Sequence, residues 1–97
     1  MTIAQLEESN ASLRLLITLN QINKQIMLSN LYEEMHKRYG LGRRAVDTAL
    51  EVCIKLDLIK REIQRIGKNP MPSIFHSLTA KGKKIAKICL ELEQALS

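Results

Sequence analysis

The chain has 97 residues, a length that fits one compact domain and excludes an enzyme assembled from several domains. Fifteen Lys and Arg against ten Asp and Glu give a formal charge of +5, and an apolar content of 45% is too high for a disordered basic tail. Aromatic side chains occur only at Tyr32, Tyr39 and Phe75, which disfavours a platform for stacking single-stranded DNA or RNA bases.

The first 22 residues predict one helix after a polar lead-in. We expect residues 1–11 to fray and Ser12 to cap a helix that runs to about Ile22. Apolar side chains fall on two opposite sides of this helix. One side carries Leu13, Leu16 and Ile17, and the other carries Leu15, Leu19 and Ile22. Two surfaces must therefore cover it, and the second is either another subunit or the C-terminal helix of the same chain.

A second helix is predicted up to about Tyr39, after a short strand at Gln25–Met27. Asn30 and Glu33 have the spacing of a capping box, with Ser29 as the competing cap. The residues expected in the core share one stripe of the helix. They are Leu31, Tyr32, Met35 and Tyr39. Gly40 and Gly42 end the helix and turn the chain, and His36 is expected on the surface.

The third predicted helix spans roughly Arg43–Leu56 and is amphipathic. Its expected core positions recur at helical spacing. They are Val46, Ala49, Leu50, Cys53 and Leu56. The opposite arc is polar and carries Arg44, Asp47, Thr48, Glu51 and Lys55, with Arg43 in the exposed first turn.

The pattern then changes to that of strands. Leu58–Ile66 and Ile74–Leu78 predict two strands joined by Gly67–Ser73, where two prolines and a glycine force a turn. We expect His76 to be a hydrogen-bonded histidine of this hairpin, and a pH switch is the alternative. Thr79 is a predicted N-cap, and the last helix runs to about Leu96. Its apolar stripe consists of Ile85, Ile88, Cys89, Leu92 and Leu96.

The positive charge is concentrated in one part of the chain. Residues 36–87 hold thirteen Lys and Arg against four Asp and Glu, a balance of +9, whereas residues 1–35 and 88–97 each carry −2. A polyanion is the partner that such a segment favours. The alternative is a basic surface that serves solubility only.

This order of elements resembles a winged helix-turn-helix DNA-binding domain, the fold of MarR-like and PadR-like regulators and of many small archaeal and archaeal-virus proteins. Two passages carry the resemblance. Tyr39–Val46 with Leu50 and then Leu56–Arg61 look like the turn, the recognition helix and the first wing strand, and Leu78–Gly82 looks like the junction after the wing. The resemblance implies a mainly α fold with a small β-hairpin wing (α+β), as a single domain over residues 1–97. Asp57 departs from it, because many relatives have Gly there.

The resemblance implies a sequence-specific double-stranded DNA-binding protein, a homodimeric transcriptional regulator, with sites on the third helix and the hairpin. The expected DNA contacts are Arg43, Arg44, Asp47, Thr48, Lys55, Arg65, Lys68 and Asn69. The expected dimer interface pairs the first helix with the helix over residues 79–96. Its members are Leu15, Leu19, Ile22, Ile85, Ile88, Cys89, Leu92 and Leu96.

Two alternatives stay open. Asp47 and Glu51 place negative charge on the face expected to meet DNA, and they have the i, i+4 spacing to pair with Arg43 and Lys55 instead. The same acids suit a winged-helix module that docks another protein in a transcription or processing complex. Cys89 could form an intersubunit disulfide, which occurs inside hyperthermophiles.

Several classes of function find no support in the sequence. Cys53 and Cys89 lie 36 positions apart without neighbouring histidines, so we expect no metal site and no cofactor. The sequence contains no phosphate-binding loop and no nucleophile motif, so we expect neither an enzyme nor a small-molecule ligand. The longest apolar run is Leu15–Ile17, and the N-terminus lacks the pattern of a signal peptide, so we expect an intracellular, cytoplasmic protein.

Overall fold

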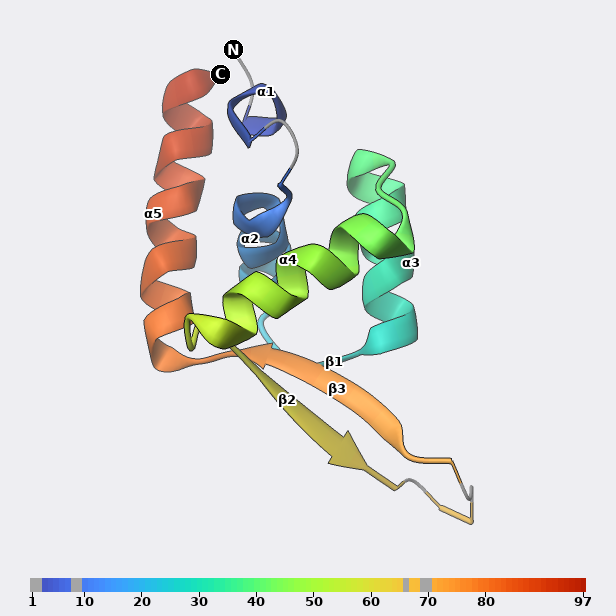
Figure 1. Ribbon diagram of the computed structural model, residues 1–97. Coiled ribbons are helices and arrows are strands. Elements are labelled where there is room, and N and C mark those ends of the chain that lie inside the picture. The colour runs from blue at the N-terminus through green and yellow to red at the C-terminus, as the bar shows by residue number, and fades with distance from the viewer. Residues whose placement is uncertain (1–2, 8–9, 66, 69–70) are drawn as a thin grey trace.

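The computed structural model describes residues 3–7, 10–65, 67–68 and 71–97. Within these ranges, five helices and three short strands follow one another in the order helix, helix, strand, helix, helix, strand, strand, helix. They are α1 (Ile3–Glu7), α2 (Ser12–Ile22), β1 (Ile26–Met27), α3 (Leu28–Tyr39), α4 (Arg43–Lys55), β2 (Ile59–Gln64), β3 (Ser73–Leu78) and α5 (Ala80–Leu96). The helices lie on one side of the sheet, and the β2–β3 hairpin extends away from them (Figure 1).

Helix α2 is the centre of the core. Leu15, Leu16, Ile17 and Leu19 are all buried, and α5 and α4 pack against the helix from different sides. Both of its apolar faces are therefore covered within the chain. Of the two expected covers, another subunit or the C-terminal helix, the structure contains the second.

The N-terminal segment forms a packed helix, and the expectation of a frayed lead-in was wrong for residues 3–7. Ile3 is buried, and α1 contacts α2 and α5. The buried carboxylate of Glu7 accepts hydrogen bonds from the backbone N–H groups of Leu13 and Arg14 and pairs with the Arg14 guanidinium at 2.8 Å. Glu7 thus satisfies the free N–H groups at the start of α2.

The predicted N-caps of the first two long helices were also wrong. Ala11 occupies the N-cap of α2, and Ser12 instead donates its N–H and its hydroxyl to Asn10 Oδ1. Helix α3 begins at Leu28, earlier than the Asn30–Glu33 capping box requires, and no side chain caps it. The predicted end of α3 is confirmed, because Gly40 terminates the helix with a φ of 68°.

Helix α4 buries Val46, Ala49, Leu50 and Cys53 as predicted, but it ends one residue early, at Lys55. Asp57 adopts a left-handed conformation with a φ of 59°, and the Leu58 N–H donates to the Cys53 carbonyl at 2.8 Å. Together with the bond from Asp57 N–H to the Ile54 carbonyl, this is a Schellman motif. Leu56 therefore leaves the helical stripe and is 55% exposed, contrary to its predicted core position.

The three strands form an antiparallel sheet in the order β1–β3–β2. In the hairpin, Ile59 lies opposite Leu78, Arg61 opposite His76 and Ile63 opposite Ile74. Because side chains alternate along a strand, these six residues share the face of the hairpin that lies toward α4. Strand β2 ends at Gln64, two residues earlier than predicted, and β3 begins one residue earlier, at Ser73.

Helix α5 begins at the predicted cap, because the Thr79 hydroxyl accepts a hydrogen bond from the Gly82 N–H at 2.9 Å. Its inner face is formed by Gly82, Ala86 and Cys89, which are buried. Four lysines of this helix are exposed. They are Lys81, Lys83, Lys84 and Lys87.

Candidate nucleic-acid interface

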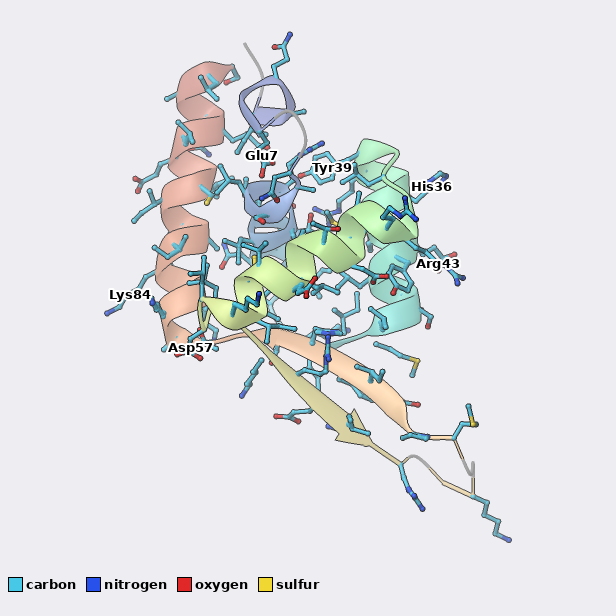
Figure 2. All side chains as sticks on the ribbon, viewed as in Figure 1. Glu7, His36, Tyr39, Arg43, Asp57 and Lys84 are labelled. Carbon is cyan, nitrogen blue, oxygen red and sulfur yellow. The ribbon has the colours of Figure 1, made fainter. Side chains whose placement is uncertain are left out.

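One face of α4 is polar and exposed, and it is fixed in place by the buried face behind it. The exposed side chains are Arg43, Arg44, Asp47, Thr48, Glu51 and Lys55. Helices α2 and α3 support α4 from behind, and the hairpin lies beside it (Figure 1). The first turn of α4 carries Arg43 next to α3, and Lys55 lies at the opposite end (Figure 2).

A contact between α3 and α4 organises the first turns of α4. The Tyr32 hydroxyl donates a hydrogen bond of 2.5 Å to Asp47 Oδ1, and the Arg43 guanidinium lies 5.3 Å from the centre of the Tyr32 ring. Partial burial and the bond to Asp47 raise the pKa of Tyr32 above its ordinary value, so the hydroxyl keeps its proton. Tyr32 thus belongs to the expected core stripe and also holds two residues of the exposed face.

For Asp47 and Arg43, this contact takes the place of the ion pair that the spacing allowed. Within the described residues, Asp47 does not pair with Arg43, and Glu51 does not pair with Lys55. The i, i+4 alternative was therefore wrong for both pairs. Asp47 has one carboxylate oxygen engaged by Tyr32, and Arg43 stacks on the same ring.

Arg44 and Thr48 lie one turn apart on the exposed face. The Thr48 hydroxyl donates to the Arg44 backbone carbonyl at 2.9 Å, which leaves the hydroxyl oxygen able to accept. The Arg44 guanidinium forms no hydrogen bond or ion pair with the part of the chain that the structure describes. It is therefore available to an external acceptor.

The hairpin adds basic residues beyond the end of the sheet. Arg65 follows β2 directly, Lys68 lies in the turn, and both are exposed. Asn69, the third residue expected here, lies outside the described residues. The projecting hairpin carries these charges away from the helices (Figure 1).

Arg61 and His76, which were not among the expected site residues, meet between α4 and the hairpin. They line a pocket of about 390 Å³ whose other wall includes Asp47 and Glu51. Arg61 Nε lies 3.4 Å from His76 Nε2 and donates to it. The strand alternation Ile59, Arg61, Ile63 was the available signal, since it places a charge on the face that packs toward α4.

His76 is not the fully hydrogen-bonded histidine that we expected. Its side chain is buried, with 1% exposure, and Nδ1 has no hydrogen-bond partner among the described residues. Burial, followed by the charge of Arg61, lowers the pKa of His76 below its ordinary value of 6.5, while Asp47 acts in the opposite direction. The ring is therefore neutral at pH 7, and because Nε2 accepts from Arg61, the proton resides on Nδ1.

The residues expected at a dimer interface divide into two groups. Leu15, Leu19 and Cys89 are buried in the core of the chain itself. Ile22, Ile85, Leu92 and Leu96 are half-buried, and Ile88 is 59% exposed on the outer side of α5. Any apolar surface that this set offers to a second copy therefore comes from the second group.

Both cysteines are free and buried. Burial raises the pKa of the Cys53 thiol to about 11 and also raises that of Cys89. The side chain of Cys89 faces inward and is 3% exposed, so an intersubunit disulfide would require α5 to turn. Cys53 packs in the core, as predicted.

Within the described ranges, no three His, Cys, Asp or Glu side chains lie close enough together to hold a metal ion. Across the same residues, none of the helices has both the length and the apolar character that a membrane span requires.

The fold matches solved structures, whereas no protein-family model and no curated protein matches the sequence. A protein described as a MarR-family transcriptional regulator from Porphyromonas gingivalis W83 superposes with a TM-score of 0.68 at 20% identity, over 94% of this chain and 81% of that one. The circadian-clock-associated protein Pex from Anabaena gives 0.67 at 10% identity, over 90% and 79%. The adhesin competence repressor AdcR from Streptococcus pyogenes gives 0.64 at 19% identity, over 96% and 63%. The chain has the winged-helix fold that the resemblance implied.

Proposed function

We propose that this chain is a double-stranded DNA-binding protein that acts as a homodimeric transcriptional regulator. The observation that carries the proposal is the position of the exposed first turns of α4 beside a projecting basic hairpin, with Arg44 unpaired among the residues that the structure describes. Two of the structural neighbours are described as transcriptional regulators or repressors, and their similar fold supports the proposal. The neighbours also favour a regulator over an enzyme.

In this proposal α4 enters the major groove, which is about 12 Å wide and admits one helix. Arg43 and Arg44 reach base edges or the flanking phosphates from the first turn, with Asp47 and Thr48 one turn further along. Lys55 meets the backbone at the other end of the helix. Arg65, Lys68 and Asn69 lie along the backbone or the minor groove and add affinity that depends on salt and little on sequence.

The proposed dimer uses the apolar residues on the outer side of α5. Ile88 is the most exposed of them, and Ile85, Leu92 and Leu96 lie along the same helix, with Ile22 at the end of α2. A twofold axis at this surface would present two copies of α4 to half-sites about 34–36 Å apart, or a multiple of that distance.

DNA binding is tested with a labelled random-sequence duplex of about two helical turns, titrated at several salt concentrations. Arg44→Ala is expected to weaken binding and to reduce the slope of log affinity against log salt by about one. Lys84→Ala is the matched control, because it removes one exposed positive charge on the far side of α5 (Figure 2). Absence of binding at low salt, or affinity that does not depend on salt, would contradict the proposal.

Sequence specificity and the dimer need separate measurements. Selection of bound duplexes from a random pool should return a site with two related halves, and a pool with no enriched sequence would contradict specific recognition. Sedimentation of the wild type should give a dimer at micromolar concentration, and Ile88→Asp should give a folded monomer, because the exposed side chain adds little to the core. A monomeric wild type would contradict the dimer.

The second candidate is a winged-helix module that binds another protein through the face of α4. Asp47 and Glu51, both exposed on that face, are the observation that favours it. In that case the Arg43→Ala, Arg44→Ala double variant would keep the nucleic-acid affinity of the wild type and would lose a protein partner in affinity capture.

A further inference from the structure

Arg61 and His76 form a pair of side chains that bridges the hairpin and the recognition face. They lie opposite each other in the β2–β3 register, and Arg61 Nε donates to His76 Nε2 at 3.4 Å. Arg61 is exposed, whereas His76 is buried. Both line the pocket whose other wall includes Asp47 and Glu51 of α4, so the guanidinium lies in the gap between α4 and the base of the hairpin.

We propose that Arg61 contacts a DNA phosphate beside α4, and that neutral His76 is the residue that positions it. This inference rests on the proposed function and adds to it one contact residue and its dependence on protonation.

The position of Arg61 suits a phosphate contact. When a helix occupies the major groove, the phosphates of both strands run along the walls of the groove, a few ångströms to either side of the helix. Arg61 lies on the hairpin side of α4, on the face of β2 that lies toward that helix. The bond to His76 uses only the Nε–H, and the outer N–H groups of the guanidinium form no hydrogen bond or ion pair with the described residues, which leaves them available to a phosphate.

The two carboxylates of the pocket compete with phosphate for the same guanidinium. Asp47 and Glu51 share the pocket with Arg61, yet within the described residues neither forms an ion pair with it. Asp47 has one oxygen engaged by the Tyr32 hydroxyl. The bond from Nε to His76 holds the guanidinium against the sheet, and this restraint keeps it from turning to the acids.

Protonation of His76 removes that restraint. A doubly protonated ring has no acceptor at Nε2, and its positive charge repels Arg61. The acids of the pocket then attract the released guanidinium and also stabilise the charged ring. The charged groups around His76 are Arg61 from β2 and Asp47 and Glu51 from α4, whereas Leu28 from α3 and the β1 neighbour Ile26 carry no charge. Acid is therefore expected to remove the Arg61 contact.

The unsatisfied Nδ1 atom supports a role beyond stability. A buried donor without a partner destabilises the folded state, and an apolar side chain of similar size would avoid that cost. A histidine at this position is explained by its other ring nitrogen, because Nε2 accepts the hydrogen bond from Arg61.

The test compares DNA affinity at pH about 7.5 and at a pH below the titration midpoint of His76 in the folded chain, which its ring nitrogen signals locate, at constant ionic strength. The probe is a labelled random-sequence duplex of about two helical turns, because a phosphate contact requires no defined operator. His76→Gln keeps an acceptor near the position of Nε2 but does not titrate. At the higher pH it should bind like the wild type. At the lower pH the wild type should bind about five- to tenfold more weakly than this variant, because it loses the affinity that one phosphate contact contributes.

Arg61→Gln should bind about five- to tenfold more weakly than the wild type at the higher pH, with the salt slope reduced by about one. Lys60→Gln is the matched control, because it removes the same charge from the adjacent residue on the opposite face of β2 and should leave the pH dependence unchanged. His76→Leu is a second variant, used in case His76→Gln does not fold. It removes the acceptor of the Arg61 bond, so it should remain folded and bind DNA weakly at both pH values.

A readout without DNA tests the pair itself. The ring nitrogen signals of His76 should show a proton on Nδ1 at neutral pH, and its titration should move to higher pH in Arg61→Gln because a repelling charge is removed. An equal ratio of wild-type and His76→Gln affinities at both pH values would overturn the inference, as would wild-type affinity in Arg61→Gln. A wild type that binds no duplex at any pH would instead refute the proposed function itself, and this inference with it.

Discussion

The hydroxyl group of Thr79 joins the start of α5 to the turn that ends α4. It donates a hydrogen bond to the Asp57 carbonyl at 2.6 Å and accepts one from the Gly82 N–H at 2.9 Å. The Thr79 N–H also donates to the Leu58 carbonyl at 3.1 Å. The two passages on which the resemblance rested are therefore in direct contact, and this junction fixes where the hairpin leaves the helices.

Replacing Thr79 with Ala should weaken this junction. The variant loses the N-cap of α5 and leaves the Asp57 carbonyl without its hydroxyl donor, so the free energy of unfolding should fall by about 1–2 kcal/mol. Urea denaturation measures the loss. Thr79→Ser retains the hydroxyl and should recover most of it, whereas equal losses in both variants would mean that the methyl group, and not the hydroxyl, stabilises the junction.

Gly82→Ala should destabilise the fold more strongly. A Cβ at this position would lie 1.9 Å from the Leu58 carbonyl oxygen, and because the obstacle is backbone, α5 must move away from the turn. We expect a loss of about 3 kcal/mol or more in urea denaturation. Gly42→Ala is the control, since a Cβ there meets nothing within 4 Å, and its effect should be much smaller. Comparable losses in the two variants would contradict the close approach.

Asp57 tests the one departure from the resemblance. Its φ of 59° lies in the left-handed region, which disfavours side chains and favours glycine. Asp57→Gly should therefore be at least as stable as the wild type, whereas Asp57→Ala should lose about 1 kcal/mol. The midpoint of thermal unfolding orders the three proteins, and a Gly variant less stable than the wild type would show that the carboxylate contributes more than relief of the left-handed backbone.

Among the ion pairs of the described residues, the contact between Glu7 and Arg14 should be the most sensitive to substitution. Both side chains are buried, and Glu7 also accepts from two N–H groups at the start of α2. Glu7→Ala leaves a buried guanidinium without a counter-ion and should cost about 3–5 kcal/mol of unfolding free energy. Glu34→Ala breaks the more exposed pair with Arg38 and should cost less than about 0.5 kcal/mol. Similar losses would contradict the difference in burial.

The elements with local signals were predictable from the sequence, and those defined by distant partners were not. Thr79 and Gly40 mark helix ends through their own side chain or backbone, so their roles were read correctly. Glu7 caps α2 only because α1 packs beside it, and no spacing rule describes that contact. Leu56 continued the helical period in sequence, but the left-handed turn at Asp57 removed it from the buried stripe.

The candidate site divides in the same way. The exposed arc of α4 follows from its amphipathic period, and Arg43, Arg44, Asp47 and Thr48 lie on it as expected. The partner of Asp47 could not be predicted, because the i, i+4 rule considers one helix and Tyr32 comes from another. Arg61 was missed for a related reason. Its importance arises from the register that places it opposite His76 and beside α4.

The buried histidine should make the stability of the fold depend on pH. The pKa of His76 is lower in the folded chain than its ordinary value of 6.5, so between those two values the unfolded chain binds more protons. The free energy of unfolding should therefore fall as the pH drops below about 6.5, and the loss should continue until the folded pKa is reached. Urea denaturation at pH about 7.5 and about 5.5 measures it.

His76→Leu should remove this dependence, because the unfolded variant no longer gains the proton. At the higher pH it should be as stable as the wild type or more stable, since it lacks the buried Nδ1 donor that has no partner among the described residues. His36→Gln, a substitution at an exposed histidine, is the control and should leave the difference between the two pH values unchanged. If wild type and His76→Leu lost the same stability on acidification, His76 would not be the residue whose protonation opposes folding, because its charged form would then be accommodated in the core.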